Sequence, residues 1–354
     1  MHWRPLISVS VAAGLLAAAL TGCSLIDEDI SRCNNQVRLT YELRLDPEII
    51  QELEDELDLH ADEDIRGMLK EYIDGVFTNY ARDVDLLFYD TNEPMGLLRS
   101  LVEKMNSSSN TYSISMPVRS YMHTAIANVK VSENVLLSGE ENFSTCWMEH
   151  EKVGDYYYPQ RSGLFTAHRR LDVGEKANQR FRIRLGMANS ATALILDTGK
   201  ATNVKDIRVE VEGMAVAFNP ADSTYLYDDK AVFATEEFST GYKHCYAAVH
   251  FPSQDGPEEE EYEEETTDTK ATEYDDDDVV NPERKLWRWK VYATLTDGSV
   301  TRSILEMRPP VKAGQLKIRN AFVMDEGQVG SNEVGVSITV QMDWRPGLDI
   351  EVPL

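Results

Sequence analysis

The sequence predicts an all-β protein of two domains, with helical insertions in the first. Many short runs alternate apolar with polar residues, which is typical of half-buried strands. Turn residues separate these runs, as in the Asp-Gly type hairpin sequence Thr296-Asp297-Gly298-Ser299. The 354 residues are enough for two ordinary domains. We place the domain boundary near Glu175, which gives an N-terminal domain over 35–174 and a C-terminal domain over 175–354.

The N-terminus predicts a lipoprotein signal peptide over residues 1–22. Arg4 precedes an apolar run from Leu6 to Leu20, which is shorter than the ~20 apolar residues of a spanning helix. The run ends in a lipobox, Leu20, Thr21 and Gly22 followed by Cys23, so we expect Cys23 to be lipidated. Two alternatives remain: an ordinary cleaved signal with an incidental cysteine, and a short membrane anchor.

Residues 23–34 are predicted to form a lipidated tether. They are polar and acidic, with Asp27, Glu28 and Asp29 close to the cysteine. No later segment is apolar for long enough to cross a bilayer. The acyl chains on Cys23, each contributing about 0.8 kcal/mol per buried CH₂, are therefore expected to be the only attachment to the membrane.

The first domain is predicted to begin with the strand Val37–Leu45. Its odd-numbered residues are apolar, while Arg38, Glu42 and Arg44 lie on the opposite face. An acidic helical segment then starts at Pro47, and a second helix runs from about Asp62 to Tyr80. The following elements are expected to be a strand over 84–90, a short helix over 97–105, strands over 112–116 and 121–131, a loop over 139–160 and a short strand over 163–167.

The second domain is predicted from strands at the spacing of a β-sandwich. The alternating run Phe181–Leu185 is expected to begin this new set of strands. The further strands are expected over 191–196, 207–211, 215–218, 244–251, 287–295, 300–304 and 334–344.

An acidic segment interrupts the second domain over 255–278. It contains fourteen acidic residues and a single basic one, Lys270, and so carries half of the formal net charge of −26. A run of one charge repels itself and cannot bury enough apolar surface to fold, so a disordered loop is expected. The overall balance argues against nucleic acid as a partner, because binding to phosphate needs clustered Lys and Arg.

Cysteines do not build this fold. Cys33, Cys146 and Cys245 remain once Cys23 is acylated. Three thiols allow at most one disulfide and leave one thiol free, and the sequence leaves the pairing open.

No motif predicts catalysis, a cofactor or a metal. The sequence has no phosphate-binding glycine loop, no Gly-x-Ser-x-Gly elbow and no His-Glu-x-x-His. His244 and His250 share a strand face but lie about 20 Å apart, which is too far for a metal pair. The run Asp275–Asp278 is expected to be a solvated loop, because it lacks the spacing of a calcium loop. Trp287, Trp289 and Tyr156–Tyr158 are expected to pack in a core or at an edge, with stacking on sugars as the alternative.

Three stretches resemble the FimB/Mfa2-type fimbrial subunit (anchor) family of Bacteroidales. The first is the lipobox with its acidic tether and second cysteine, Cys23–Cys33, leading into the strand Val37–Leu45. The second is Val84–Asp90, a strand ending in an aromatic residue and Asp. The third is the C-terminal run Glu333–Gly347. The resemblance spans nearly the whole chain.

The resemblance implies two tandem transthyretin-like β-sandwiches and a non-enzymatic, lipid-anchored protein of the outer membrane. Such a protein attaches a fimbria by strand-mediated assembly with fimbrial stalk or accessory subunits. The helical segment Pro47–Tyr80 and the acidic insertion depart from the family pattern. The acidic tether is similar to a surface-export signal, which favours the cell surface. A surface glycan-binding lipoprotein is the alternative function.

Overall fold

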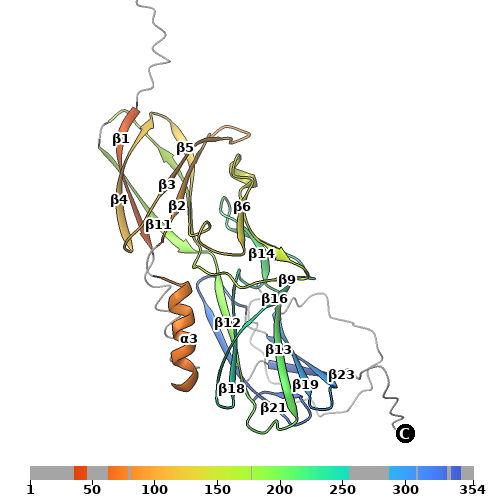
Figure 1. The fold of residues 1–354 in the computed structure, drawn as a ribbon. Coiled ribbons are helices and arrows are strands. Elements are labelled where there is room, and N and C mark those ends of the chain that lie inside the picture. The colour runs from red at the N-terminus through yellow and green to blue at the C-terminus, as the bar shows by residue number, and fades with distance from the viewer. Residues whose placement is uncertain are drawn as a thin grey trace, which may run out of the picture.

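The structure is a computed structural model, in which strands dominate and form four sheets (Figure 1). It describes residues 36–45, 63–78, 81–176, 178–254, 287–307, 310–332 and 336–343. The expected signal peptide, the tether, the helical segment from Pro47 and the acidic segment lie outside these ranges. In the part described, no helix is both long and apolar enough to cross a membrane.

Seven strands form the first sheet, in the order β3-β2-β5-β10-β11-β1-β4. Since β10 and β11 pair only at Phe165–Met187 and Thr166–Gly186, the sheet opens there and folds into two layers around one core. These layers make the first sandwich. Its strands are β1 (Gln36–Leu45), β2 (Val84–Tyr89), β3 (Leu97–Glu103), β4 (Ser109–Pro117), β5 (Ser120–Ala127), β10 (Phe165–Asp172) and β11 (Gln179–Met187).

Strand β1 confirms the alternation expected from the sequence. Leu39, Tyr41 and Leu43 point into the core and are at most 2% exposed. Two arginines connect strands of the two layers that do not pair there. Arg99 of β3 donates to the Ser115 carbonyl of β4, and Arg169 of β10 donates to the Arg182 carbonyl of β11. The guanidinium groups thus give these two main-chain carbonyls a hydrogen-bond donor.

The expected helix over 97–105 is wrong, because Leu97–Glu103 is the edge strand β3. It pairs antiparallel with β2, and its side chains alternate in exposure. Leu98 and Val102 are 44% and 52% exposed, whereas Leu101 packs against the core. A short run with apolar residues at 97, 98, 101 and 102 fits a helix as well as a strand, and pairing with β2 decided between them.

The strand Phe181–Leu185 does not begin a new set of strands. It lies in β11, which pairs in parallel with β1 through residues such as Tyr41–Phe181 and Leu43–Ile183. The chain leaves the first sheet over β6 to β9 and returns to it with β10 and β11. It passes on to β12 of another sheet between Met187 and Ser190, one strand after the expected boundary at Glu175. Alternation reveals a strand but not its neighbours, so the sequence left this pairing hidden.

Two further sheets enclose a second core and form the second sandwich. The five-stranded sheet has the order β17-β18-β12-β21-β22, and the seven-stranded sheet has the order β23-β20-β19-β13-β16-β9-β8. Their strands are β8 (Lys152–Val153), β9 (Tyr156–Tyr157), β12 (Ser190–Asp197), β13 (Val204–Glu212), β16 (Val232–Ala234), β17 (Glu236–Thr240), β18 (Lys243–His250), β19 (Trp287–Leu295), β20 (Val300–Met307), β21 (Leu316–Val323), β22 (Val329–Gly330) and β23 (Val336–Asp343).

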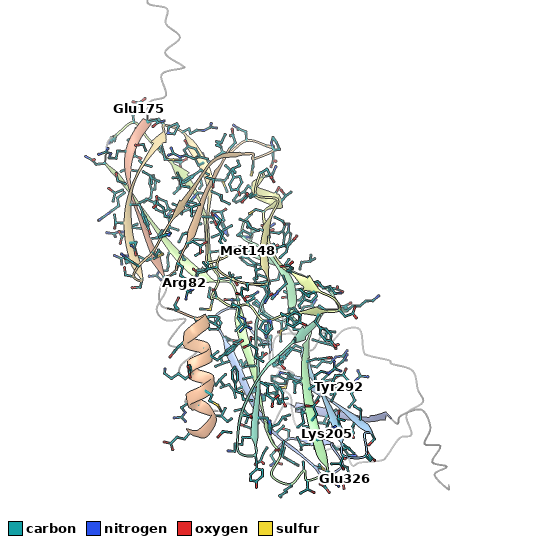
Figure 2. The ribbon with its side chains drawn as sticks, viewed as in Figure 1. Arg82, Met148, Glu175, Lys205, Tyr292 and Glu326 are labelled. Carbon is teal, nitrogen blue, oxygen red and sulfur yellow. The ribbon has the colours of Figure 1, made fainter. Side chains whose placement is uncertain are left out.

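A four-stranded sheet, in the order β15-β14-β7-β6, lies between the sandwiches over a third core. Figure 2 shows Met148 of this core near the middle of the molecule, between Glu175 at one end and Glu326 at the other. Its strands are β6 (Val135–Ser138), β7 (Trp147–His150), β14 (Ala215–Asn219) and β15 (Thr224–Tyr227), and a 3₁₀ turn spans Phe143–Thr145. The expected loop over 139–160 therefore contains β7, β8 and β9.

The helix α3 (Glu63–Val76) confirms the helix expected over 62–80, but it packs on the second sandwich (Figure 1). Its apolar side packs on β17 and β18, and Ile195, Cys245 and Ile318 of the second sandwich belong to the same apolar cluster. The Tyr72 and Phe238 rings are 5.1 Å apart, and Gly163 N donates to the Val76 carbonyl at 2.8 Å. A helix from the first third of the chain thus shares a core with the second sandwich.

Candidate functional site

The predicted lipidation site lies outside the described residues. Leu20, Thr21, Gly22 and Cys23 all precede Gln36, where the description begins. Their assignment as lipobox and lipidation site stays a prediction.

Two of the three remaining cysteines are free thiols. Cys146 lies in the third core, and Cys245 lies beneath α3, so they are buried in different places and not joined to each other. Burial raises the pKa of the Cys146 thiol to about 11 and that of Cys245 to about 12. Both are therefore protonated at neutral pH and are poor nucleophiles. Cys33 lies outside the described residues.

The aromatic residues considered for sugar stacking are mostly buried. Trp287 and Trp289 are 2% and 0% exposed, with ring centroids 4.4 Å apart in the second core. Tyr157 stacks on Phe233 in the same core, at 5.2 Å. The core position that we expected for the tryptophans is confirmed, and they offer no face to a glycan.

The two histidines of β18 have separate partners. His244 Nδ1 lies 2.8 Å from Glu237 Oε1. His250 is fully buried, and its Nε2 lies 2.9 Å from Thr192 Oγ1. Burial lowers the pKa of His250 to about 4, so the ring is neutral at pH 7. Both rings act as local hydrogen-bonding groups and do not share a ligand position.

One cavity of about 290 Å³ lies near His244, at the end of the second sandwich. Its polar lining comes from Thr198, Lys205, Asp206, Glu237, His244 and Tyr246. Charges of both signs meet here, and Glu237 is already hydrogen-bonded to His244. This lining suits water or a small polar molecule.

Strand β23 offers the longest regular edge of the second sandwich. It pairs antiparallel with β20 along all eight residues, from Val336–Met307 to Asp343–Val300. It ends the seven-stranded sheet, so among the described strands none pairs with its other side. Val340 is 37% exposed, and Ile338 packs against the second core. Main-chain groups along such an edge can pair with a strand from another protein.

The sequence did not reveal the arginine face, which is the outer surface of the layer β4-β1-β11. Two adjacent strands place five arginines on the same face as Glu42: Arg38 and Arg44 on β1, and Arg180, Arg182 and Arg184 on β11. Glu42 lies 2.6 Å from Arg44, 3.0 Å from Arg182 and 3.7 Å from Arg180. The hydrogen bond from Arg44 holds the pKa of Glu42 below its usual value.

Comparison with known proteins finds likeness only among solved structures. No family model matches the chain, and no curated protein matches it.

A candidate adhesin from Bacteroides ovatus is 13% identical, with a TM-score of 0.48, covering 75% of this chain and 82% of that chain. The fimbrial anchor protein Mfa2 from Porphyromonas gingivalis is 8% identical, with a TM-score of 0.45, covering 86% and 98%. The tip fimbrial protein Mfa3 from the same organism is 8% identical, with a TM-score of 0.37, covering 87% and 100%. The solved structures similar to this chain thus include a fimbrial anchor and a fimbrial tip protein.

Proposed function

We propose that this chain is a fimbrial anchor or accessory subunit without enzymatic activity, attached to the outer membrane by a lipid on Cys23. Its partners are fimbrial stalk or other accessory subunits, and it works at the cell surface. In this proposal the two sandwiches are tandem transthyretin-like domains, and the helical and acidic segments are insertions. The lipobox supports the anchor, and the sheet edges support the assembly.

The edge of β23, with which no described strand except β20 pairs, is the observation that carries the assembly part of the proposal. An incoming strand would extend the seven-stranded sheet by main-chain hydrogen bonds, which supply affinity without a specific side-chain pocket. Eight residues of regular pairing with β20 set the direction and twist that the incoming strand would follow.

The arrangement of the two sandwiches suits an anchor. Strand β1, which follows the tether in the sequence, belongs to the first sandwich, whereas β23 belongs to the second (Figure 1). A lipid attached before β1 would hold the first sandwich near the membrane and leave the edge of β23 farther out. A fimbrial subunit could then add to the second sandwich without meeting the lipid surface.

A pull-down from the native outer membrane tests the proposal. The tagged wild type should recover a repeating β-rich subunit and incorporate labelled palmitate, and Cys23→Ala should lose both the label and the membrane attachment. Val340→Lys should lower recovery of the subunit, because lysine on an edge strand opposes edge pairing. Val153→Lys is the matched control, since Val153 is 51% exposed on β8 at the opposite edge of the same sheet.

Each outcome separates the parts of the proposal. If Val153→Lys lowers recovery and Val340→Lys does not, the subunit binds at β8 and the assignment of β23 is wrong. If the wild type instead recovers a transporter or glycan-processing proteins, the fimbrial role is wrong.

A further inference from the structure

We propose that the arginine face docks on the phosphate groups of anionic lipid headgroups and so orients the first sandwich against the membrane. This inference rests on the proposed lipid anchor at Cys23, which would place the face beside a bilayer. The anchor supplies attachment, and the face would determine which side of the protein meets the lipid.

The charge of the face is opposite to that of the whole chain. Five arginines and one glutamate lie on this face and have a formal charge of +4 together, whereas the chain carries −26. The side chains of Arg44, Arg180 and Arg182 are 54–63% exposed, although each is near Glu42. These three guanidinium groups thus share one carboxylate and still present more than half of their side-chain surface to water.

The chemistry of the face selects phosphate. A guanidinium group offers a planar fork of donors that matches phosphate oxygens, and it is more weakly hydrated than an ammonium group. Between Arg38 and Arg44 the strand advances six residues, or about 20 Å, so the arginines cover an area of several lipid headgroups. Strand β4 continues the surface with the exposed hydroxyl residues Ser109, Thr111 and Ser113.

A lipid surface fits this face better than a protein partner does. Protein interfaces are usually centred on aromatic or apolar anchors that become fully buried. None of the large apolar side chains exposed in the described residues lies on β1, β4 or β11. A flat array of guanidinium and hydroxyl groups lacks such an anchor but complements a layer of headgroups.

The distance from the proposed lipid also fits. Gln36 follows Cys23 by thirteen residues, and a chain of that length spans at most about 45 Å. Basic residues near an anionic surface act together with acyl chains as a second attachment signal. The acidic remainder of the chain is repelled by the same surface, so only one orientation brings the arginine face into contact.

Vesicle co-sedimentation tests the proposal without the anchor. The mature chain with Cys23→Ala is mixed with vesicles of phosphatidylcholine alone, or with phosphatidylglycerol added. We expect binding to the anionic vesicles only, weakening as salt is raised. Arg38→Gln, Arg180→Gln and Arg184→Gln together should weaken binding about 100-fold, since each basic residue contributes roughly tenfold or less near such a surface. This variant keeps Arg44 and Arg182, the hydrogen-bonded partners of Glu42.

Two control variants address charge and folding. Lys200→Gln, Lys230→Gln and Lys312→Gln remove the same charge from exposed positions on the other sandwich and should leave binding within about twofold. Glu42→Gln removes the one negative charge of the face and keeps one of the two acceptor oxygens that receive Arg44 and Arg182, and it should tighten binding about fivefold. The increase should appear on the anionic vesicles only, because a misfolded chain would also sediment with phosphatidylcholine alone.

The results of the vesicle assay test the docking of the arginine face separately from the lipid on Cys23. Equal binding to both kinds of vesicle, or equal loss from both triple variants, would overturn the proposal. If the arginine variant loses the subunit in the pull-down but still binds vesicles like the wild type, the face is a protein interface and the lipid proposal is wrong. Failure of palmitate labelling would remove the anchor, whereas the vesicle result does not depend on it.

Discussion

The docking of α3 on the second sandwich makes the most direct prediction, because it joins distant parts of the chain. Leu69 lies on the apolar side of the helix and is 0% exposed. Replacing it with alanine removes buried methyl groups and leaves a cavity between the helix and the sheet. Such a change at a fully buried leucine costs about 2–5 kcal/mol.

The labelling rate of the Cys245 thiol measures how often α3 leaves the second sandwich. Cys245 lies in the core that α3 covers, whereas Cys146 lies in the third core, and each is at most 1% exposed. If Leu69→Ala costs about 3 kcal/mol, the helix is undocked about 100 times more often, since 1.4 kcal/mol is a factor of ten. We expect the labelling rate of Cys245 to rise by that factor.

The assay uses a chain with Cys23→Ala and Cys33→Ser, so that only the two buried thiols react. Labelling with a thiol reagent is followed at each cysteine by mass spectrometry, and stability is measured by urea titration. With and without Leu69→Ala, Cys245 should label faster than Cys146. Undocking of α3 is enough to expose Cys245, and it exposes less core and so costs less free energy than the global unfolding that exposes Cys146.

The control is Leu98→Ala at the exposed edge of the first sandwich. Leu98 is 44% exposed, so its replacement should change stability by less than about 0.5 kcal/mol and leave the labelling of Cys245 unchanged. The reasoning is refuted if Leu69→Ala costs less than about 1 kcal/mol, or if the labelling of Cys245 does not respond.

Two further predictions concern a buried histidine and a backbone turn. Burial lowers the pKa of His123 to about 4, below its value of ~6.5 in an unfolded chain, so between these pH values only the unfolded chain binds the proton. This residue should therefore lower the free energy of unfolding by about 1.4 kcal/mol per pH unit as pH drops from 6.5 to 4. Urea titrations at several pH values should show that the free energy of unfolding of His123→Gln depends less steeply on pH than that of the wild type. The same pH dependence in both proteins would contradict this. Gly139 has φ +61°, and a Cβ there would lie 2.0 Å from a main-chain oxygen, whereas Gly154 has φ +64° and open space around it. Gly154→Ala should lower the free energy of unfolding by about 1 kcal/mol, because of the left-handed backbone alone, and Gly139→Ala should lower it clearly more. If both variants unfold at the same temperature, the turn at Gly139 is not rigid.

The local periodicity of the sequence predicted most individual elements. The alternation in Val37–Leu45 defined β1, and the Asp-Gly turn defined the hairpin of β19 and β20. The helical spacing of Ile65, Leu69 and Ile73 defined the buried side of α3. These patterns are legible because a strand or helix with one buried face repeats its apolar residues at a fixed interval.

Periodicity did not predict the structure of short apolar runs or the partners of the strands. Leu97–Glu103 fits both periods over its seven residues, and only the neighbouring strand β2 made it β3. The two tryptophans of β19 point inward because the second core is on their side, which alternation cannot show. In each case contacts with other elements determined the structure of the segment.

The sequence by itself therefore determined the all-β character, the position of most strands, the amphipathic helix and the predicted lipobox at Cys23. Only the tertiary structure decided that β11 pairs with β1, that α3 covers the second sandwich, and that arginines from two strands form one face. The physical reason is that periodicity records which side of an element is buried, a property of a few neighbouring residues. The partner of that side is chosen by packing between elements far apart in the sequence, and no local pattern encodes it. Glu42 and Arg182 are 140 residues apart, and Tyr72 and Phe238 are farther apart still.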